Sequence, residues 1–237
     1  MNKLYRIIGN PLHEELSVFL KFYGIPFSPV NVSPFKSGMF KIYGHKSLPV
    51  VASKENQKQI LNSDIKKIIQ TYVKQTQNRD LSTNEISWIN YINKNVEPSV
   101  TLYLGKNTNF PRMLYSYVNN INNPIGFLDR YIYRYCIPLW FFLKFQFNGR
   151  KALTLSYATS SDYPISVIGA EIADRLYSKN IEDEVYLAGS KPGLIDICLY
   201  GALRPLQLID QVGVLSNIKT INWFNNMNTL YTLKCIE

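Results

Sequence analysis

Apolar positions follow two different spacings along the chain, and the change occurs within residues 76–83. Before it, short apolar runs bounded by turn residues, which predict strands, alternate with segments whose apolar residues recur every three or four positions, which predict helices. After it, only the helical spacing continues. The pattern predicts an α/β domain over residues 1–75, a polar linker over 76–83 and an all-helical domain over 84–237.

The N-terminal domain is expected to begin with a β-α-β unit and to end with a hairpin and a helix. Strands are predicted at 4–8, 27–32, 48–52 and in a segment after 54–56 that ends near residue 61. Helices are predicted from Asn10-Pro11 to Gly24, over 34–43 with Ser33 as the cap, and after Asn62-Ser63. This order of elements is that of the thioredoxin fold.

Pro49 precedes the third predicted strand, at the position where thioredoxin-like folds hold a cis-proline. A cis bond before proline costs only about 0.5–1 kcal/mol, so it can be kept where it serves a purpose. Here it would expose the backbone of Leu48 to pair with an extended, peptide-like ligand. A trans proline that opens an edge strand is the alternative, and the order of the surrounding elements favours the cis form.

The C-terminal domain is expected to be helical throughout. Ser82 or Thr83 is a suitable cap for its first helix. Further helices are predicted at 111–121, 127–147 with an interruption at Pro138, 163–178, 194–209 and 221–233.

The charge and the cysteine and histidine content limit the classes of function. The formal net charge is +9, but the basic residues are spread along the chain, so we expect a basic solvated surface and no specific nucleic-acid binding. Cys136, Cys198 and Cys235 form no Cys-x-x-Cys pair, which favours a reducing compartment. The chain has only two histidines, which excludes a metal site built from several histidines.

The N-terminal residues lack the apolar core of a signal peptide, and no uncharged apolar run approaches the ~18 residues that span a bilayer. We therefore expect a cytoplasmic protein that is soluble or peripheral on intracellular membranes.

The strongest local motif is Lys191–Arg204, Lys-Pro-Gly-Leu-Ile-Asp-Ile-Cys-Leu-Tyr-Gly-Ala-Leu-Arg. Asp196 stands three residues after Gly193, so its carboxylate can accept from the unpaired backbone N–H groups there, as in a capping box. This is a folding element without chemistry of its own. The chain resembles membrane-associated prostaglandin E synthase type 2, a family of the glutathione-transferase superfamily, in this segment and in Leu4-Tyr5, Ile25-Pro26-Phe27, Leu48-Pro49 and Trp223-Phe224.

The resemblance implies a glutathione-transferase-like fold and a glutathione-dependent isomerase or transferase that acts on a hydrophobic substrate. The family carries Cys-Pro-x-Cys at the start of the first helix, where this chain has Asn10-Pro11-Leu12-His13. A thiolate at a helix N-terminus is the usual nucleophile of this fold. Because the N-terminal domain contains no cysteine, thiol–disulfide exchange at this position is excluded.

The candidate residues that remain form a ligand site, as the resemblance implies. Glutathione would pair with the backbone at Leu48-Pro49 and set its γ-glutamyl carboxylate at the helix start Asn62-Ser63-Asp64, with Pro11 close by; otherwise Asn62 and Ser63 are simply a helix cap. Asn10 is expected to donate a hydrogen bond to a bound thiolate. His13 is a candidate weak acid or base, or a contact for haem, which family members bind together with glutathione; otherwise it is an exposed side chain.

Aromatic residues dominate Tyr131–Phe145, with Arg134 and Lys144 among them. A buried interdomain helix is the simplest interpretation. A hydrophobic ligand cleft, an oligomer interface and a membrane interface are the alternatives. Because the resembled family is membrane-associated and dimeric, peripheral membrane contact through this segment and a homodimer are also expected.

Two functions remain open at this point. The first is a glutathione-dependent enzyme that works without a catalytic cysteine. The second is a catalytically silent relative that binds a ligand, haem, a membrane or a protein partner.

Overall fold

The N-terminal part of the chain forms a four-stranded sheet in the order β2-β1-β3-β4. The computed structural model describes residues 2–7, 9–32, 48–55, 58–62, 65–107, 165–177 and 185–236. The strands are β1 (Asn2–Arg6), β2 (Phe27–Asn31), β3 (Val50–Glu55) and β4 (Lys58–Asn62). β1 pairs parallel to β2 and antiparallel to β3, and β3 pairs antiparallel to β4.

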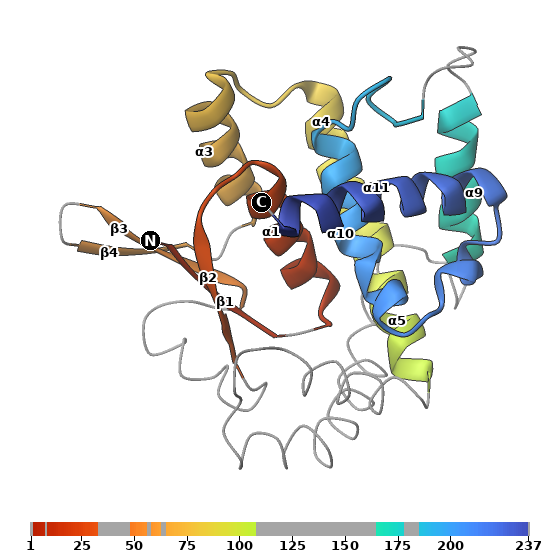
Figure 1. Cartoon of the computed structure of the whole chain (residues 1–237), viewed down its shortest axis with the longest axis horizontal. Coiled ribbons are helices and arrows are strands. Elements are labelled where there is room, and N and C mark those ends of the chain that lie inside the picture. Colours follow the sequence, from red (N-terminus) through yellow and green to blue (C-terminus); the bar gives the residue numbers. More distant parts are fainter. Residues whose placement is uncertain are drawn as a thin grey trace.

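Among the described residues, this domain also has the helices α1 (Pro11–Phe22), between β1 and β2, and α3 (Ile65–Gln77), after β4 (Figure 1). The thioredoxin-like expectation is confirmed, with Pro29 in the edge strand β2. The bond between Leu48 and Pro49 is cis, also as predicted. The helix predicted over 34–43 lies outside the described residues.

The regular elements described in the C-terminal part are helices, apart from an isolated bridge between Tyr186 and Gly189. The helices are α4 (Thr83–Tyr91), the π-helix η2 (Ile92–Val96), α5 (Glu97–Lys106), α9 (Ile165–Tyr177), α10 (Leu194–Leu208), the 3₁₀ helix η4 (Val212–Leu215) and α11 (Ile218–Ile236). The predicted helices at 163–178 and 194–209 are confirmed, and α11 starts at Ile218 rather than at 221. The segments 111–121 and 127–147, with the aromatic stretch Tyr131–Phe145, lie outside the described residues.

Sequence reasoning missed α5. Its signal was present, because Val96, Val100 and Leu104 are spaced four residues apart and all three are fully buried. Pro98 concealed the helix, yet proline is tolerated in a first helical turn, where its missing N–H costs no intrahelical bond.

The two parts of the chain meet mainly where α1 packs against α10, near the centre of Figure 1. At Gly201 of α10, a Cβ atom would lie 2.5 Å from the Cα of Glu15. The helix backbones therefore touch at this point, and only glycine fits. α11 packs against both α9 and α10 and brings Trp223 and Phe224 into the core.

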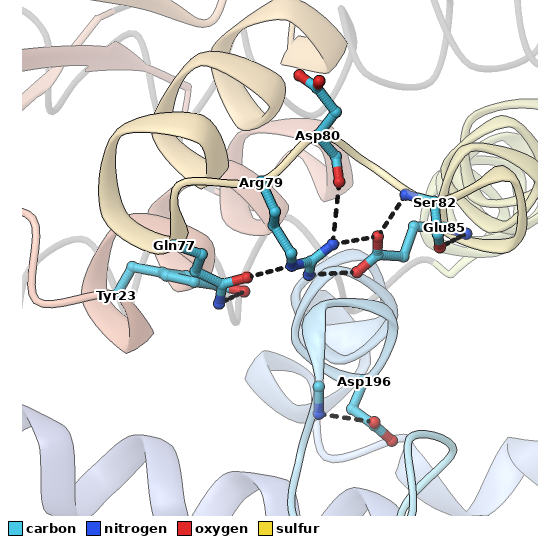
Figure 2. A network of polar contacts seen from close by, with 8 residues as sticks. Tyr23, Gln77, Arg79, Asp80, Ser82, Glu85 and Asp196 are labelled. Atoms are coloured by element: carbon cyan, nitrogen blue, oxygen red, sulfur yellow. Dashed lines mark hydrogen bonds and ion pairs between the residues drawn. The ribbon is translucent and has the colours of Figure 1, made fainter.

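Arg79 orders the connection between α3 and α4 (Figure 2). Its guanidinium donates to both carboxylate oxygens of Glu85, each at 2.7 Å, and to the Gln77 side chain at 2.7 Å. Ser82 and Glu85 form the capping box of α4. Because α3 continues to Gln77, it occupies the first two residues of the predicted linker.

We expect Arg79→Ala to lower the free energy of unfolding by about 1 kcal/mol, since a bidentate pair on the surface is worth little more. Urea unfolding at low and high salt measures the loss, which should shrink at high salt. Lys74→Ala is the matched control, because Lys74 and Asp80 pair at 3.4 Å with both side chains well exposed. A larger loss for Lys74→Ala than for Arg79→Ala would contradict this account of the linker.

Within the described residues, no helix has the length and apolar character needed to cross a bilayer.

Candidate functional site

The strand register brings three predicted ligand-site segments to one end of the sheet. Val50, the first residue of β3, pairs with Tyr5 near the end of β1. Val51 pairs with Asn62, the last residue of β4. The carboxyl ends of β1 and β4 are therefore close to one another. The start of α1 and the cis bond between Leu48 and Pro49 lie at the same end of the sheet. Ligands of open α/β sheets bind at this end of the strands.

Asn10 is the N-cap of α1, as predicted. Its side-chain Oδ1 accepts from the Leu12 backbone N–H at 3.1 Å, and its backbone carbonyl accepts from His13 and Glu14, each at 3.0 Å. Pro11 occupies the first turn, where no donor is lost. With Oδ1 committed to the cap, the side chain of Asn10 has its amide N–H groups left for a ligand. These donors lie at the positive end of the helix dipole.

His13 is buried, with only 2% of the residue exposed, so the interpretation of an exposed side chain is wrong. The Ile7 backbone N–H donates to His13 Nδ1 at 2.6 Å. The imidazole thus satisfies a backbone group between β1 and α1, where no strand partner is at hand. With Nδ1 engaged by the Ile7 backbone, only Nε2 of this buried ring is left for another contact.

Leu48 and Pro49 are both buried, and Leu48 is 7% exposed. Their side chains belong to the core, so what they can offer a ligand is their main chain. Ser63 and Asp64, like the side chain of Asn62, lie outside the described part of the structure. The carboxylate-binding half of the site stays a prediction.

A buried charge cluster lies behind the start of α1. Glu14 is fully buried and pairs with Arg204 of α10 and, at 3.5 Å, with Arg6 of β1. Burial alone would raise the pKa of Glu14, but the two guanidinium groups hold it below its usual value. Arg6 also donates to Ser17 at 3.0 Å and to Asn31 at 3.3 Å. The cluster ties the sheet, α1 and α10 together.

Glu15, the next residue, is buried without such compensation. Burial and the nearby Glu97 carboxylate raise the pKa of Glu15 to about 8. The Cys198 thiol of α10 lies beside it, and burial raises the pKa of that thiol well above its usual value. The sequence of α1 gives no signal that this acidic residue is buried.

Neither the surface hollow beside α3 nor the described acidic, histidine and cysteine side chains form a second site. A surface hollow of about 470 Å³ on the outer side of α3 is lined only by exposed side chains, which are Lys67, Gln70, Thr71, Lys74, Gln75 and Asp80. It lacks the buried polar groups that would orient a bound ligand. Among the described residues, no group of histidine, cysteine and acidic side chains is arranged to hold a metal ion.

Comparison with known proteins gives a fold and no closer identity. No family model and no curated protein matches the chain. Among solved structures, the glutathione transferase GSTFuA3 from Phanerochaete chrysosporium aligns with a TM-score of 0.60 and 12% identity, over 98% of this chain and 96% of that one. A glutathione transferase of Ceriporiopsis subvermispora, in complex with glutathione, aligns with a TM-score of 0.55 and 15% identity, over 98% and 97%.

FzlA from C. crescentus also aligns, with a TM-score of 0.55 and 13% identity, over 94% of this chain and 85% of that one. These comparisons do not confirm the closer resemblance to prostaglandin E synthase type 2. A thioredoxin-like sheet followed by a helical domain, aligned over nearly the whole chain, shows that this protein has the fold of the glutathione transferases.

Proposed function

We propose that the protein binds glutathione at the carboxyl end of the sheet and presents its thiol to a hydrophobic substrate. The observation that carries the proposal is the geometry of Asn10. Its Oδ1 caps α1, which leaves its amide N–H groups as donors at the positive end of a twelve-residue helix. The fold supports the choice of ligand, because one aligned transferase was solved in complex with glutathione.

Glutathione would supply the sulfur nucleophile that the chain lacks at this position. Asn10 would donate a hydrogen bond to the sulfur, and the helix dipole would favour the charged form of the thiol. The backbone at Leu48-Pro49 would pair with the peptide part, and the turn at Asn62-Ser63-Asp64 would bind the γ-glutamyl carboxylate.

A prostaglandin E synthase-like isomerase is the narrower form of this proposal. The alternative is a silent protein that binds glutathione or a hydrophobic molecule without turnover. Haem has no part in either form of the proposal. A homodimer and peripheral membrane contact through Tyr131–Phe145 remain predictions.

The test begins with calorimetric titration of reduced glutathione, for which we expect micromolar to low-millimolar affinity. Conjugation to an electrophile such as 1-chloro-2,4-dinitrobenzene then separates an enzyme from a silent binder. Asn10→Asp keeps the capping oxygen but removes the donors and adds a negative charge beside the thiolate. We expect it to bind glutathione weakly and to lose activity on the order of 100-fold.

Asn10→Ser is the matched control, because serine both caps the helix and keeps a hydroxyl donor. It should stay within about tenfold of the wild type. Equal activity in Asn10→Asp and the wild type would remove Asn10 from the mechanism. Binding without turnover in the wild type would favour the silent alternative, and no binding at low-millimolar glutathione would overturn the proposal.

A further inference from the structure

Glu15 lies where the two parts of the chain are in closest contact. It is fully buried, and neither of its carboxylate oxygens has a hydrogen-bond partner among the described residues. The Cα of Glu15 is the atom that a Cβ on Gly201 would approach to 2.5 Å, so α1 and α10 touch at this residue. The carboxyl group is therefore enclosed by a tight helix contact in which its neighbour on α10 is the Cys198 thiol, a weak donor, and it has no cationic partner among the described residues.

Among the groups that surround Glu15, Glu97 opposes a negative charge there, and only the Cys198 thiol, a weak hydrogen-bond donor, favours one. Glu97 comes from the start of α5 and Cys198 from α10, and Glu85 of α4 acts on Cys198 in turn. Arg6 and Arg204 are paired with the neighbouring Glu14 and do not act on Glu15. Within the described residues, α3 and α11, which also contact α1, bring no charged group to act on Glu15.

We propose that Glu15 makes the contact between α1 and α10 a pH-sensitive latch, in which α1 stays docked while the carboxyl is protonated and separates locally when it is ionised. In the docked state, burial and Glu97 raise the pKa of Glu15 to about 8. In an open state, where water reaches the carboxyl, its pKa returns toward 4.5. The open population then rises about tenfold per pH unit between these values and levels off above the upper one.

The latch also bears on the proposed glutathione site, because α1 begins beside Asn10. Glutathione affinity should fall over the same pH range, a consequence that rests on the proposed function. The latch itself needs no ligand, so its failure and the failure of glutathione binding are distinguishable.

Amide hydrogen exchange of the full chain tests the latch between about pH 5.5 and pH 7.5. After correction for the intrinsic rate of exchange, we expect protection in α1 and α10 to fall on the order of 100-fold. α9 serves as the internal reference. In Glu15→Gln, which keeps the size of the side chain without a titrating group, the fall should be absent.

Glu97→Gln is the second variant. It removes a like charge from beside Glu15 and so lowers the pKa of Glu15 in the docked state. The loss of protection should therefore stop increasing at a lower pH than in the wild type. Protection that falls equally in Glu15→Gln and the wild type would overturn the latch. An equal fall in α9, or no pH dependence in the wild type, would overturn it too.

Discussion

Replacement of Asp196 by alanine is expected to leave the protein largely unfolded. The carboxylate accepts four hydrogen bonds, from the Leu187 backbone at 2.7 Å, the Ala188 backbone at 3.0 Å, the Gly193 backbone at 3.0 Å and Trp223 Nε1 at 2.8 Å. Asp196 is itself fully buried. Each buried donor left without an acceptor costs about 1–3 kcal/mol.

The summed loss, about 4 kcal/mol or more, approaches the whole stability of a typical domain. Urea unfolding followed by circular dichroism measures it, together with the yield of soluble protein. Asn217→Ala is a suitable control, because Asn217 caps α11 with one exposed hydrogen bond to Lys219 at 3.0 Å and should cost about 1 kcal/mol. If the two variants were equally stable, Asp196 would be an ordinary cap.

Asp196→Asn refines the result. Its amide keeps one acceptor oxygen but turns an N–H₂ group toward donors that need an acceptor. We expect its stability to lie between those of the wild type and Asp196→Ala.

The second large effect is expected at Glu14. Glu14→Leu leaves Arg204 and Arg6 without their shared counter-charge, and breaking a buried pair in this way costs about 3–5 kcal/mol. Arg6 keeps its bonds to Ser17 and Asn31, and Arg204 keeps its position over the Tyr231 ring. The free energy of unfolding in urea measures the loss.

The double variant Glu14→Leu with Arg204→Met is the decisive control. Because it removes both partners, it should lose less than the sum of the single variants, by about 1–3 kcal/mol. Strict additivity would mean that the two residues do not interact.

The stability lost in Glu14→Leu is also expected to depend on pH. The pKa of Glu14 is held below 4.5, so the unfolded chain takes up its proton at a higher pH than the folded protein does. The stability that Glu14 contributes is complete above that pH and is lost as the pH falls through the lower folded pKa. The gap between the wild type and Glu14→Leu should therefore be constant near neutral pH and narrow in acid.

Local sequence was sufficient for the order of elements in the N-terminal domain and for the capped helix starts, although α5 was missed and α11 begins three residues earlier than predicted. A cap and its partner stand within three residues of each other, so Asn10, Ser82 with Glu85, and Gly193 with Asp196 could be found from spacing alone. The lack of a cysteine in the N-terminal domain was equally visible, and with it the exclusion of disulfide chemistry.

The long-range contacts of Asp196 could not be predicted from the spacing of residues in the sequence. Asp196 was predicted to cap one turn, and three of its four donors, from Leu187, Ala188 and Trp223, come from outside that turn. No periodic pattern connects residues so far apart in the chain. The large loss of stability expected for Asp196→Ala could therefore be inferred only from the folded structure.

The acidic residues of α1 show the same division. An amphipathic helix normally turns its charged side chains to water, yet α1 is buried from His13 to Leu20, Glu14 and Glu15 included. The sequence of α1 specified the helix, its cap and its apolar residues. The packing of α10, with Arg204 against Glu14 and Gly201 against Glu15, made one carboxylate an ion pair and left the other buried without a cationic partner among the described residues.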